Sequence, residues 1–219
     1  MGRANTIDTR AVRALLFDLG GVVIDLDFNR VFARWAETAG CEPAAISSRF
    51  SQDAAYQQHE RGELDAAGYF AALRGCLGLD LSDEEFLEGW NDLYLGPCEG
   101  IEPLLRLASR VYPIYAFTNS NPSHQSVWSS TLRQELVYFR RVFVSSELRL
   151  RKPDLDAFRR IASETGFLIQ DFLFFDDSEE NVQGARTAGM QSVLICSADD
   201  LRDCLEQLGL RAHADEQYC

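Results

Sequence analysis

Five short apolar runs recur along the chain and constrain its fold more than any other feature. They are rich in aromatic and β-branched residues and do not alternate with polar ones: VRALLFDL (12–19), YPIYAFTN (112–119), RVFVSS (141–146), DFLFFDD (171–177) and QSVLIC (191–196). Such runs are typical of strands buried on both faces, as in a parallel sheet covered by helices. The segments between the last four are long enough for crossover helices. We therefore predict an α/β fold with a doubly wound parallel sheet.

Helix-start signals between these runs support the same fold. Asn121 precedes Pro122 and begins one predicted crossover helix, and Pro153 lies in the first turn of another. Ser178 stands before two glutamates and can cap a third helix. Proline is tolerated in the first helical turn, and a serine hydroxyl accepts a hydrogen bond from an N–H group there.

The segment after the first run interrupts the strand–helix alternation. No convincing strand lies between about residue 31 and residue 97, and helical patterns cover 28–40, a run around 46–59, 66–78 and 82–96, where Ser82 is the expected N-cap. This stretch is too long for an ordinary connection. We predict a small helical cap domain at 27–97, ending at Gly96-Pro97, inserted into a core domain made of 1–26 and 98–219.

Composition excludes several classes of protein. With 34 acidic and 21 basic side chains, the formal net charge is −13, which would repel a nucleic-acid backbone. No run of about 18 apolar residues suggests a membrane span, and the opening MGRANTIDTR lacks the apolar block of a signal peptide. The six cysteines have no C-x-x-C spacing, which favours reduced thiols and a cytoplasmic location. The sequence leaves open whether the chain is a monomer or a homodimer.

Polar residues end the predicted strands. They are Asp18, Thr118 with Asn119, Lys152 just beyond the third run, and the pair Asp176-Asp177. In open parallel sheets, ligands bind outside the carboxyl ends of the strands, so these side chains are expected to converge on one crevice. Each of them alone is also compatible with a turn, a helix cap or a solvated charge.

The three converging carboxylates imply a cation. Together they would repel one another and raise their own pKa values unless a cation neutralised them, and oxygen ligands suit Mg²⁺. A magnesium ion that keeps several waters usually serves a phosphate group. A carboxylate can accept a phosphoryl group, which Lys152 and the Thr118 hydroxyl would help to hold. The reaction class that fits is phosphoryl transfer.

The same residues resemble the four ordered motifs of the haloacid dehalogenase-like hydrolase superfamily, across nearly the whole chain. The motifs are FDLGGVV, FTN, RKP and FFDDSEEN, and the insertion resembles the helical cap of one subgroup. The resemblance implies a Rossmann-like core, with Asp18 as nucleophile and metal ligand and Lys152 steadying the charge. It implies that Thr118 and Asn119 bind the phosphoryl group, and that the Gly20 carbonyl, Asp176 and Asp177 complete the Mg²⁺ site, Asp176 directly or through water.

Gly20 departs from the family pattern. In most phosphatases that the chain resembles, the residue two after the nucleophile is an aspartate that protonates the leaving group and then activates water. General acid–base help is worth about 10²–10⁴-fold in rate. We expect a cap group, with His59 or Glu60 the nearest candidates, or a metal-bound water to substitute in part.

The stretch HERGEL adds a candidate for substrate recognition. Its residues His59, Glu60 and Arg61 lie between two predicted cap helices, where they either read the substrate's hydroxyls or form a solvated charge cluster. This stretch and DLDFNRVFARW are similar to those of bacterial α-D-glucose-1-phosphate phosphatases within the superfamily.

Together these features predict a Mg²⁺-dependent phosphomonoester hydrolase. It would act on a small phosphorylated metabolite, such as the sugar phosphate glucose 1-phosphate, through an aspartyl-phosphate. Two alternatives remain. A 2-haloacid dehalogenase would attack carbon without a metal, which leaves Asp176-Asp177 without a purpose. A catalytically weak phosphometabolite-binding protein would account for Gly20.

Overall fold

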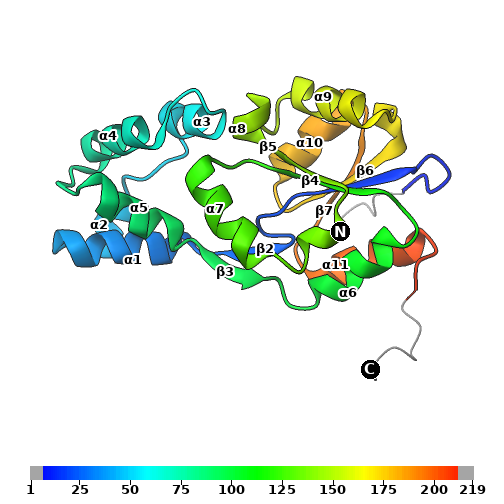
Figure 1. Ribbon diagram of the computed structural model, residues 1–219, viewed down its shortest axis with the longest axis horizontal. Helices are drawn as coiled ribbons and strands as arrows, with labels where there is room; N and C mark the ends of the chain where they lie inside the picture. The colour runs from blue at the N-terminus through cyan, green and yellow to red at the C-terminus, as the bar shows by residue number, and fades with distance from the viewer. Residues whose placement is uncertain (1–6, 212–219) are drawn as a thin grey trace.

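The computed structural model describes residues 7–211 and contains the predicted parallel sheet (Figure 1). Its five strands are all parallel and follow the order β5-β4-β1-β6-β7. Their bounds are β1 (Ala14–Phe17), β4 (Ile114–Thr118), β5 (Arg141–Val144), β6 (Phe172–Asp176) and β7 (Gln191–Leu194). The predicted α/β fold with a doubly wound sheet is confirmed. Because β1 is central, the residue that follows it lies between the ends of β4 and β6.

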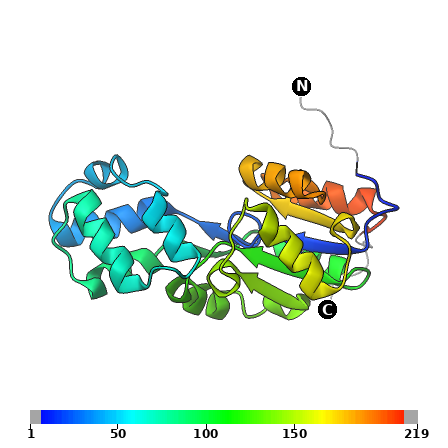
Figure 2. The same ribbon diagram turned by 90° about the horizontal axis from the view of Figure 1, so that it is seen from above.

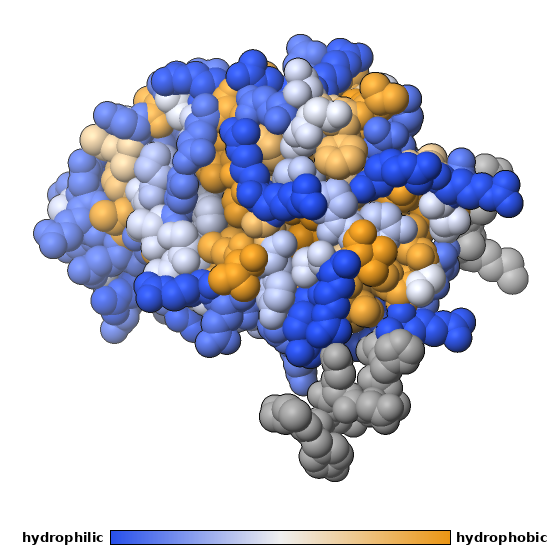
Figure 3. Space-filling model, turned by 45° about the vertical axis from the view of Figure 1, so that its right-hand side comes forward, coloured by the Kyte–Doolittle hydropathy of each residue, from blue (hydrophilic) through white to orange (hydrophobic). Residues whose placement is uncertain are grey.

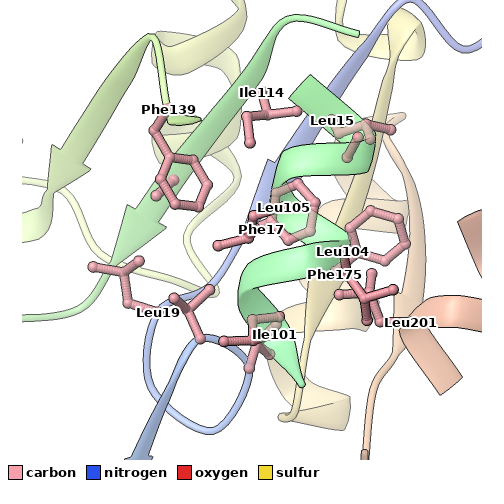
Figure 4. Close-up of a cluster of buried hydrophobic side chains, with 14 of the residues drawn as sticks. Leu15, Phe17, Leu19, Ile101, Leu104, Leu105, Ile114, Phe139, Phe175 and Leu201 are labelled. Atoms are coloured by element: carbon pink, nitrogen blue, oxygen red, sulfur yellow. The ribbon is translucent and has the colours of Figure 1, made fainter. Parts of the chain in front are cut away.

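Helices cover both faces of the sheet because alternate strand residues point to opposite sides. In β1, Leu15 and Phe17 belong to one core cluster, and Ala14 and Leu16 to the other. Figure 4 shows the first cluster, in which Leu15 and Phe17 lie beside leucines of α6. That face carries α6 (Ile101–Ser109), α7 (Pro122–Thr131) and α11 (Ala198–Gln207), and the other carries α9 (Leu155–Thr165) and α10 (Glu179–Ala188).

Two of the three predicted helix starts are confirmed. The side chain of Asn121 caps α7, and that of Ser178 caps α10. The third was wrong, because α9 begins at Leu155 and Pro153 precedes it. A turn closed by the Asp154 N–H on the Arg151 carbonyl, at 2.9 Å, contains Pro153 instead. The short α8 (Ser145–Leu148) and the 3₁₀ turns η1 (Leu136–Tyr138) and η2 (Ile169–Asp171) complete this part of the chain.

Helices α1 to α5, called the helical insert below, pack around a core of their own. Their bounds are α1 (Phe28–Ala39), α2 (Pro43–Ser47), α3 (Ala54–Glu60), α4 (Ala66–Leu77) and α5 (Asp83–Asn91). Trp35 and Trp90 stack at its centre with ring centroids 6.0 Å apart. Ser82 forms a capping box at α5, as expected.

The single helical run predicted around 46–59 was wrong, because α2 and α3 are separate helices. Asp53 starts α3 afresh by accepting a hydrogen bond from the Tyr56 N–H at 3.0 Å. Phe50, in the intervening loop, packs against the core of the insert. The loop therefore contributes an apolar side chain to the core of the insert.

A two-stranded antiparallel ribbon links the insert to the sheet. It consists of β2 (Ile24–Leu26) and β3 (Tyr94–Pro97), which carry the chain into and out of the insert (Figures 1 and 2). The expectation that no strand lies between 31 and 97 was therefore wrong for residues 94–97, which form β3. Gly96, with φ of 134°, and Pro97 mask the strand pattern, and the pairing joins segments about 70 residues apart, which no local pattern reveals.

The surface carries apolar side chains in separate areas among hydrophilic ones on the face seen in Figure 3. The large exposed apolar residues in the described part of the chain are Leu26, Leu95, Val111, Val137 and Leu168. Within residues 7–211, no helix is long and apolar enough to cross a membrane. The five described cysteines are free thiols, and Cys219 lies outside the described residues. A cytoplasmic location stays a prediction.

Candidate active site

Three neighbouring strands bring their terminal polar residues to one edge of the sheet. Asp18 follows β1, Thr118 ends β4 and Asp176 ends β6. A cavity of about 340 Å³ lies between this edge and the helical insert, and Asp18, Thr118 and Asp177 line it. The cavity thus lies at the carboxyl end of the sheet, where the sequence predicts a site.

Lys152 joins two of the carboxylates. Its Nζ lies 2.7 Å from Asp18 Oδ1 and 2.7 Å from Asp176 Oδ2. The side chain is 1% exposed, and the chain has no other lysine among its 21 basic residues. Burial alone would lower the pKa of Lys152, but the charges of Asp176 and Asp18 outweigh it and the net shift is upward. The ammonium is therefore held in its charged form between two acids.

Asp18 is buried and constrained. Its Oδ1 also accepts the Leu19 N–H at 2.6 Å, which orients the carboxylate at the end of β1. Burial raises the pKa of Asp18 well above its ordinary value, Lys152 opposes that shift, and Asp176 adds to it. A carboxylate in this setting keeps its charge best when a further cation is present.

Asp176 and Asp177 differ in their surroundings. Asp176 is fully buried, and its Oδ1 accepts the Ser178 N–H at 2.9 Å and the Asn181 Nδ2–H at 3.0 Å. Asp177 lines the cavity and is more exposed, yet burial of its carboxyl, followed by the charge of Asp176, raises its pKa. Asn181 therefore orients Asp176, while Asp177 remains available to a ligand.

The three carboxylates fit a divalent cation. Each of Asp18, Asp176 and Asp177 offers an oxygen, and these atoms lie within 4.8 Å of one another. Three carboxylates and one ammonium leave two uncompensated negative charges, which one divalent cation would neutralise. Oxygen-only ligands with this charge suit Mg²⁺. Gly20, whose carbonyl stays a predicted ligand, lines the same cavity.

Asn119 lines the cavity, but its side chain has another task. Its Oδ1 accepts the Lys152 N–H at 2.8 Å, and its Nδ2 donates to the Lys152 carbonyl at 3.0 Å. The amide therefore positions the loop that carries the ammonium. Thr118, buried at the end of β4, lines the cavity beside it.

The glycines after Asp18 allow close packing. A Cβ on Gly21, whose φ is +71°, would lie 2.1 Å from Asp177 Oδ2, so only glycine fits there. A Cβ on Gly20 would lie 2.7 Å from Leu26 Cδ1. A side chain at residue 20 would therefore meet Leu26, an apolar residue of β2.

The insert contributes one of the three HERGEL candidates to the cavity. Glu60, the last residue of α3, lines it, whereas His59 and Arg61 do not. His59 is buried, its Nδ1 lies 2.9 Å from the Leu64 carbonyl, and its ring stacks on Tyr69. Arg61 pairs with Glu63 at 2.9 Å. His59 and Arg61 therefore contact neighbouring residues of the insert and do not face the cavity.

Sequence reasoning missed several residues of the cavity wall. Arg151, adjacent to Lys152, pairs through Nε with Glu60 Oε2 at 2.8 Å. Ser145, behind the wall, donates its Oγ–H to the Glu60 carbonyl at 2.6 Å. Arg151 belongs to the RKP motif, but the sequence gives no sign that it pairs with Glu60, which is 91 residues away. The other wall residues that were not predicted include Gln52, Tyr56, Tyr94 and His124.

Residues 12–189 match the haloacid dehalogenase-like hydrolase family. The chain belongs to this family. The predicted resemblance is confirmed at that level, and the protein is a hydrolase. The four motifs quoted from the sequence all lie within the matched residues and at the site described above.

Three curated proteins that are similar to this haloacid dehalogenase-like hydrolase are described as enzymes with different activities. A D-ribitol-5-phosphate phosphatase of Bacteroides thetaiotaomicron is 23% identical over 83% of this chain and 90% of its own length. A sesquiterpene phosphatase of Aspergillus oryzae is 25% identical over 89% of this chain and 94% of its own. Drimenol cyclase of Aspergillus calidoustus is 26% identical over 87% of this chain, which spans only 35% of that protein.

A solved structure of this family shares the fold. It is a haloacid dehalogenase family enzyme of Bacteroides thetaiotaomicron in complex with magnesium and inorganic phosphate. Its TM-score to this chain is 0.70 at 25% sequence identity, and the match covers 84% of this chain and 93% of the other.

Proposed function

We propose that this hydrolase is a Mg²⁺-dependent phosphomonoester phosphatase of small phosphorylated metabolites. The observation that carries the proposal is the convergence of three carboxylates, with ligand atoms within 4.8 Å of one another, two of which contact one buried ammonium. The phosphatase relatives and the magnesium and phosphate of the similar structure support it. Asp18, Asp176, Asp177 and the Gly20 carbonyl would hold the ion, which would screen the charge of the phosphate from the attacking carboxylate.

In this mechanism, Asp18 attacks the phosphorus in line and becomes an aspartyl-phosphate, which water then hydrolyses. Lys152 neutralises charge on Asp18 and on the phosphoryl oxygens. The Thr118 hydroxyl holds the phosphoryl group. Asn119 keeps the Lys152 backbone in place through its two hydrogen bonds, a role that differs from direct phosphate binding.

We further propose a domain assignment that makes the insert a cap. Residues 27–97 form the cap domain, and residues 1–26 and 98–219 form the core domain. The cavity is lined from both sides, by Phe28, Gln52 and Glu60 of the cap segment and by the strand-end residues of the core. Such a wall excludes water and contacts the leaving group. Exchanging residues 58–64 for the equivalent segment of a relative should change which ester is preferred.

The polar part of this wall favours a sugar or polyol phosphate, of which glucose 1-phosphate is one example. Gln52, Glu60 and Arg151 offer donors and acceptors for hydroxyl groups. The cavity is also lined by the apolar residues Ile24, Leu26, Phe28 and Leu93, which support a second candidate, an isoprenoid monophosphate. Relative kcat/KM values for pentitol, hexose and isoprenyl monophosphates decide between the two.

The test of the phosphatase itself uses metal and nucleophile together. Hydrolysis of a panel of phosphate esters should require Mg²⁺, stop with chelator and disappear in Asp18→Asn, and beryllofluoride should bind the wild-type protein but not that variant. Activity that ignores chelator, or survives in Asp18→Asn, contradicts the proposal. Halide release from 2-haloacids would support the dehalogenase alternative, and tight phosphate-ester binding without turnover would support a binding protein.

A further inference from the structure

Cleavage of a phosphate ester at Asp18 needs a side chain that exchanges protons. The departing alkoxide is a strong base, so a proton donated to it lowers the barrier, and the water of the second step must lose a proton. The titratable side chains that line the cavity among the described residues are Asp18, Tyr56, Glu60, Tyr94, His124, Arg151, Lys152, Asp177 and Glu180.

Four of these are committed to other tasks by their contacts. Asp18 is the proposed nucleophile, and Asp177 belongs to the cation site. Lys152 is held between two carboxylates at 2.7 Å, and Arg151 donates its Nε to Glu60. An arginine also keeps its proton throughout the ordinary pH range.

The cavity tyrosines and histidine do not exchange protons near neutral pH. Burial raises the pKa of both Tyr56 and Tyr94 above its ordinary value, so they do not lose their protons. Burial lowers the pKa of His124 to about 3, so its ring is neutral. Its Nε2 donates to the Trp90 carbonyl at 3.0 Å, because a carbonyl can only accept. Glu180 is exposed in the first turn of α10.

Glu60 is the remaining candidate, and its contacts hold it at the cavity wall. It ends α3 and its side chain is only 7% exposed. Ser145, fully buried beside β5, donates to its carbonyl at 2.6 Å, and Arg151 fixes its Oε2 at 2.8 Å. A Cβ on Gly62, two residues later, would lie 2.7 Å from the Ser146 carbonyl oxygen, so the backbones of insert and core touch here. The carboxyl is therefore anchored to the core at the cavity wall.

We propose that Glu60 is the proton donor and acceptor of this site, an inference that rests on the proposed phosphatase function. As Asp18 attacks, the bond from phosphorus to the ester oxygen breaks, its electron pair moves to that oxygen, and the oxygen takes the Glu60 proton. The Glu60 carboxylate then removes a proton from water while the water oxygen bonds to phosphorus. The bond from phosphorus to Asp18 breaks, its electrons return to the carboxylate, and alcohol and phosphate leave.

The electrostatic surroundings of Glu60 are consistent with this role. Burial raises the pKa of its carboxyl above the ordinary value, and the charge and hydrogen bond of Arg151 oppose that shift only in part. The titratable groups that face it from its own and neighbouring elements are Arg151, Lys152, Tyr56, Tyr69 and Tyr94. A carboxyl balanced between burial and one cation can both give and take a proton.

The test compares esters whose leaving groups differ in their need for a proton. Glu60→Gln keeps the shape of the side chain and an acceptor for Arg151 but carries no transferable proton. For an alkyl ester such as a pentitol phosphate, we expect kcat/KM to fall by about 10²–10⁴-fold. For p-nitrophenyl phosphate, whose phenolate leaves unprotonated, phosphorylation of Asp18 should continue, and the phosphorylated protein should accumulate in acid-quenched mass spectra. The alkaline limb of the wild-type pH–rate profile for the alkyl ester should vanish in the variant.

The matched control is Glu88→Gln, which alters an exposed carboxylate of α5 in the same insert, paired with Arg34 at 3.4 Å. This variant should leave kcat/KM for both esters and the pH–rate profile unchanged. Equal losses of kcat/KM for both esters in Glu60→Gln, without accumulation of the phosphorylated protein, would mean that the residue only positions the cap. No loss of kcat/KM for either ester would mean that Glu60 takes no part in the reaction; either result overturns the inference. Wild-type protein that hydrolyses neither ester and binds no beryllofluoride would instead overturn the phosphatase function.

Discussion

The side-chain amide of Asn119 holds the backbone of Lys152 on both sides, accepting its N–H at 2.8 Å and donating to its carbonyl at 3.0 Å. This contact ties the end of β4 to the loop after α8. The position of the ammonium between Asp18 and Asp176 therefore depends on a residue 33 positions away in the sequence. An amide is suited to this because it donates and accepts at the same time.

Asn119→Ala should reduce turnover more than substrate binding. Two hydrogen bonds are lost, which should lower the free energy of unfolding by about 1–3 kcal/mol. The released loop should let the ammonium move, so kcat should fall while KM changes little. Denaturant unfolding and steady-state kinetics measure the two effects. Asn29→Ala, at an exposed amide of α1, is the control. A variant with unchanged kcat and raised KM would indicate direct substrate binding instead.

Lys152→Met should destabilise the protein and abolish turnover. It leaves Asp18 and Asp176 buried without their cation, which costs about 3–5 kcal/mol for a broken buried pair. Adding Asp176→Asn should recover much of that stability, because one of the two uncompensated charges is removed, but should not restore activity. Thermal unfolding of both variants at constant pH checks this order. Equal stability of the single and double variants would contradict it.

The single lysine also offers a direct probe of the site. Protein labelled with ¹⁵N-lysine has one labelled side chain, and its ammonium contacts two of the proposed cation ligands. Titration with Mg²⁺ should shift this signal, and addition of chelator should reverse the shift. The same titration with Asp177→Asn should need more Mg²⁺. A signal that ignores Mg²⁺ would place any binding elsewhere.

Magnesium should stabilise the folded protein, and Gly21→Ala should weaken that effect. At an ion concentration 100 times the Kd, stabilisation amounts to about 2.7 kcal/mol. The added methyl group would overlap Asp177 Oδ2, and φ at this position is +71°. The Asp177 carboxylate, a proposed Mg²⁺ ligand, must therefore move. Gly75→Ala, a helical position with open space around it, should instead raise stability and keep the full Mg²⁺ response. Thermal shifts with and without Mg²⁺ compare the two variants.

His124 should make stability fall in acid. Burial lowers its folded-state pKa from 6.5 to about 3, so the folded protein resists protonation that the unfolded chain accepts. Its contribution is complete above pH 6.5 and is lost as the pH falls towards 3, with a slope of about 1.4 kcal/mol per pH unit. His124→Phe should show a correspondingly shallower decline in urea unfolding over this window. Identical slopes in the two proteins would disprove the assignment.

Much of the site could be predicted because it lies at strand ends. Asp18, Thr118 and Asp176 each end an apolar run, and the rules of parallel sheets place such ends together without further information. Ser82, Asn121 and Ser178 acted as helix caps for an equally local reason, since the capping side chain and its N–H partner are three residues apart.

Other features depend on partners far apart in the chain. The β2–β3 ribbon pairs Ile24 with Pro97, and the Arg151–Glu60 pair joins core and insert. Neither partner carries a local pattern that identifies the other. His59 and Glu60 are neighbours in the sequence, but successive helical residues point in different directions, so only Glu60 reaches the cavity.

Local periodicity and chain order were thus sufficient for the α/β sheet, the helical insertion and the acidic edge, because burial on two faces and strand polarity follow from short stretches of residues. Long-range packing decided the rest. It determined that Asn119 binds the Lys152 backbone, that Leu26 packs beside Gly20, and that Glu60 and not His59 lines the cavity. These outcomes depend on the distance and orientation of side chains from separate elements, which are established only when the sheet and the insert pack against each other.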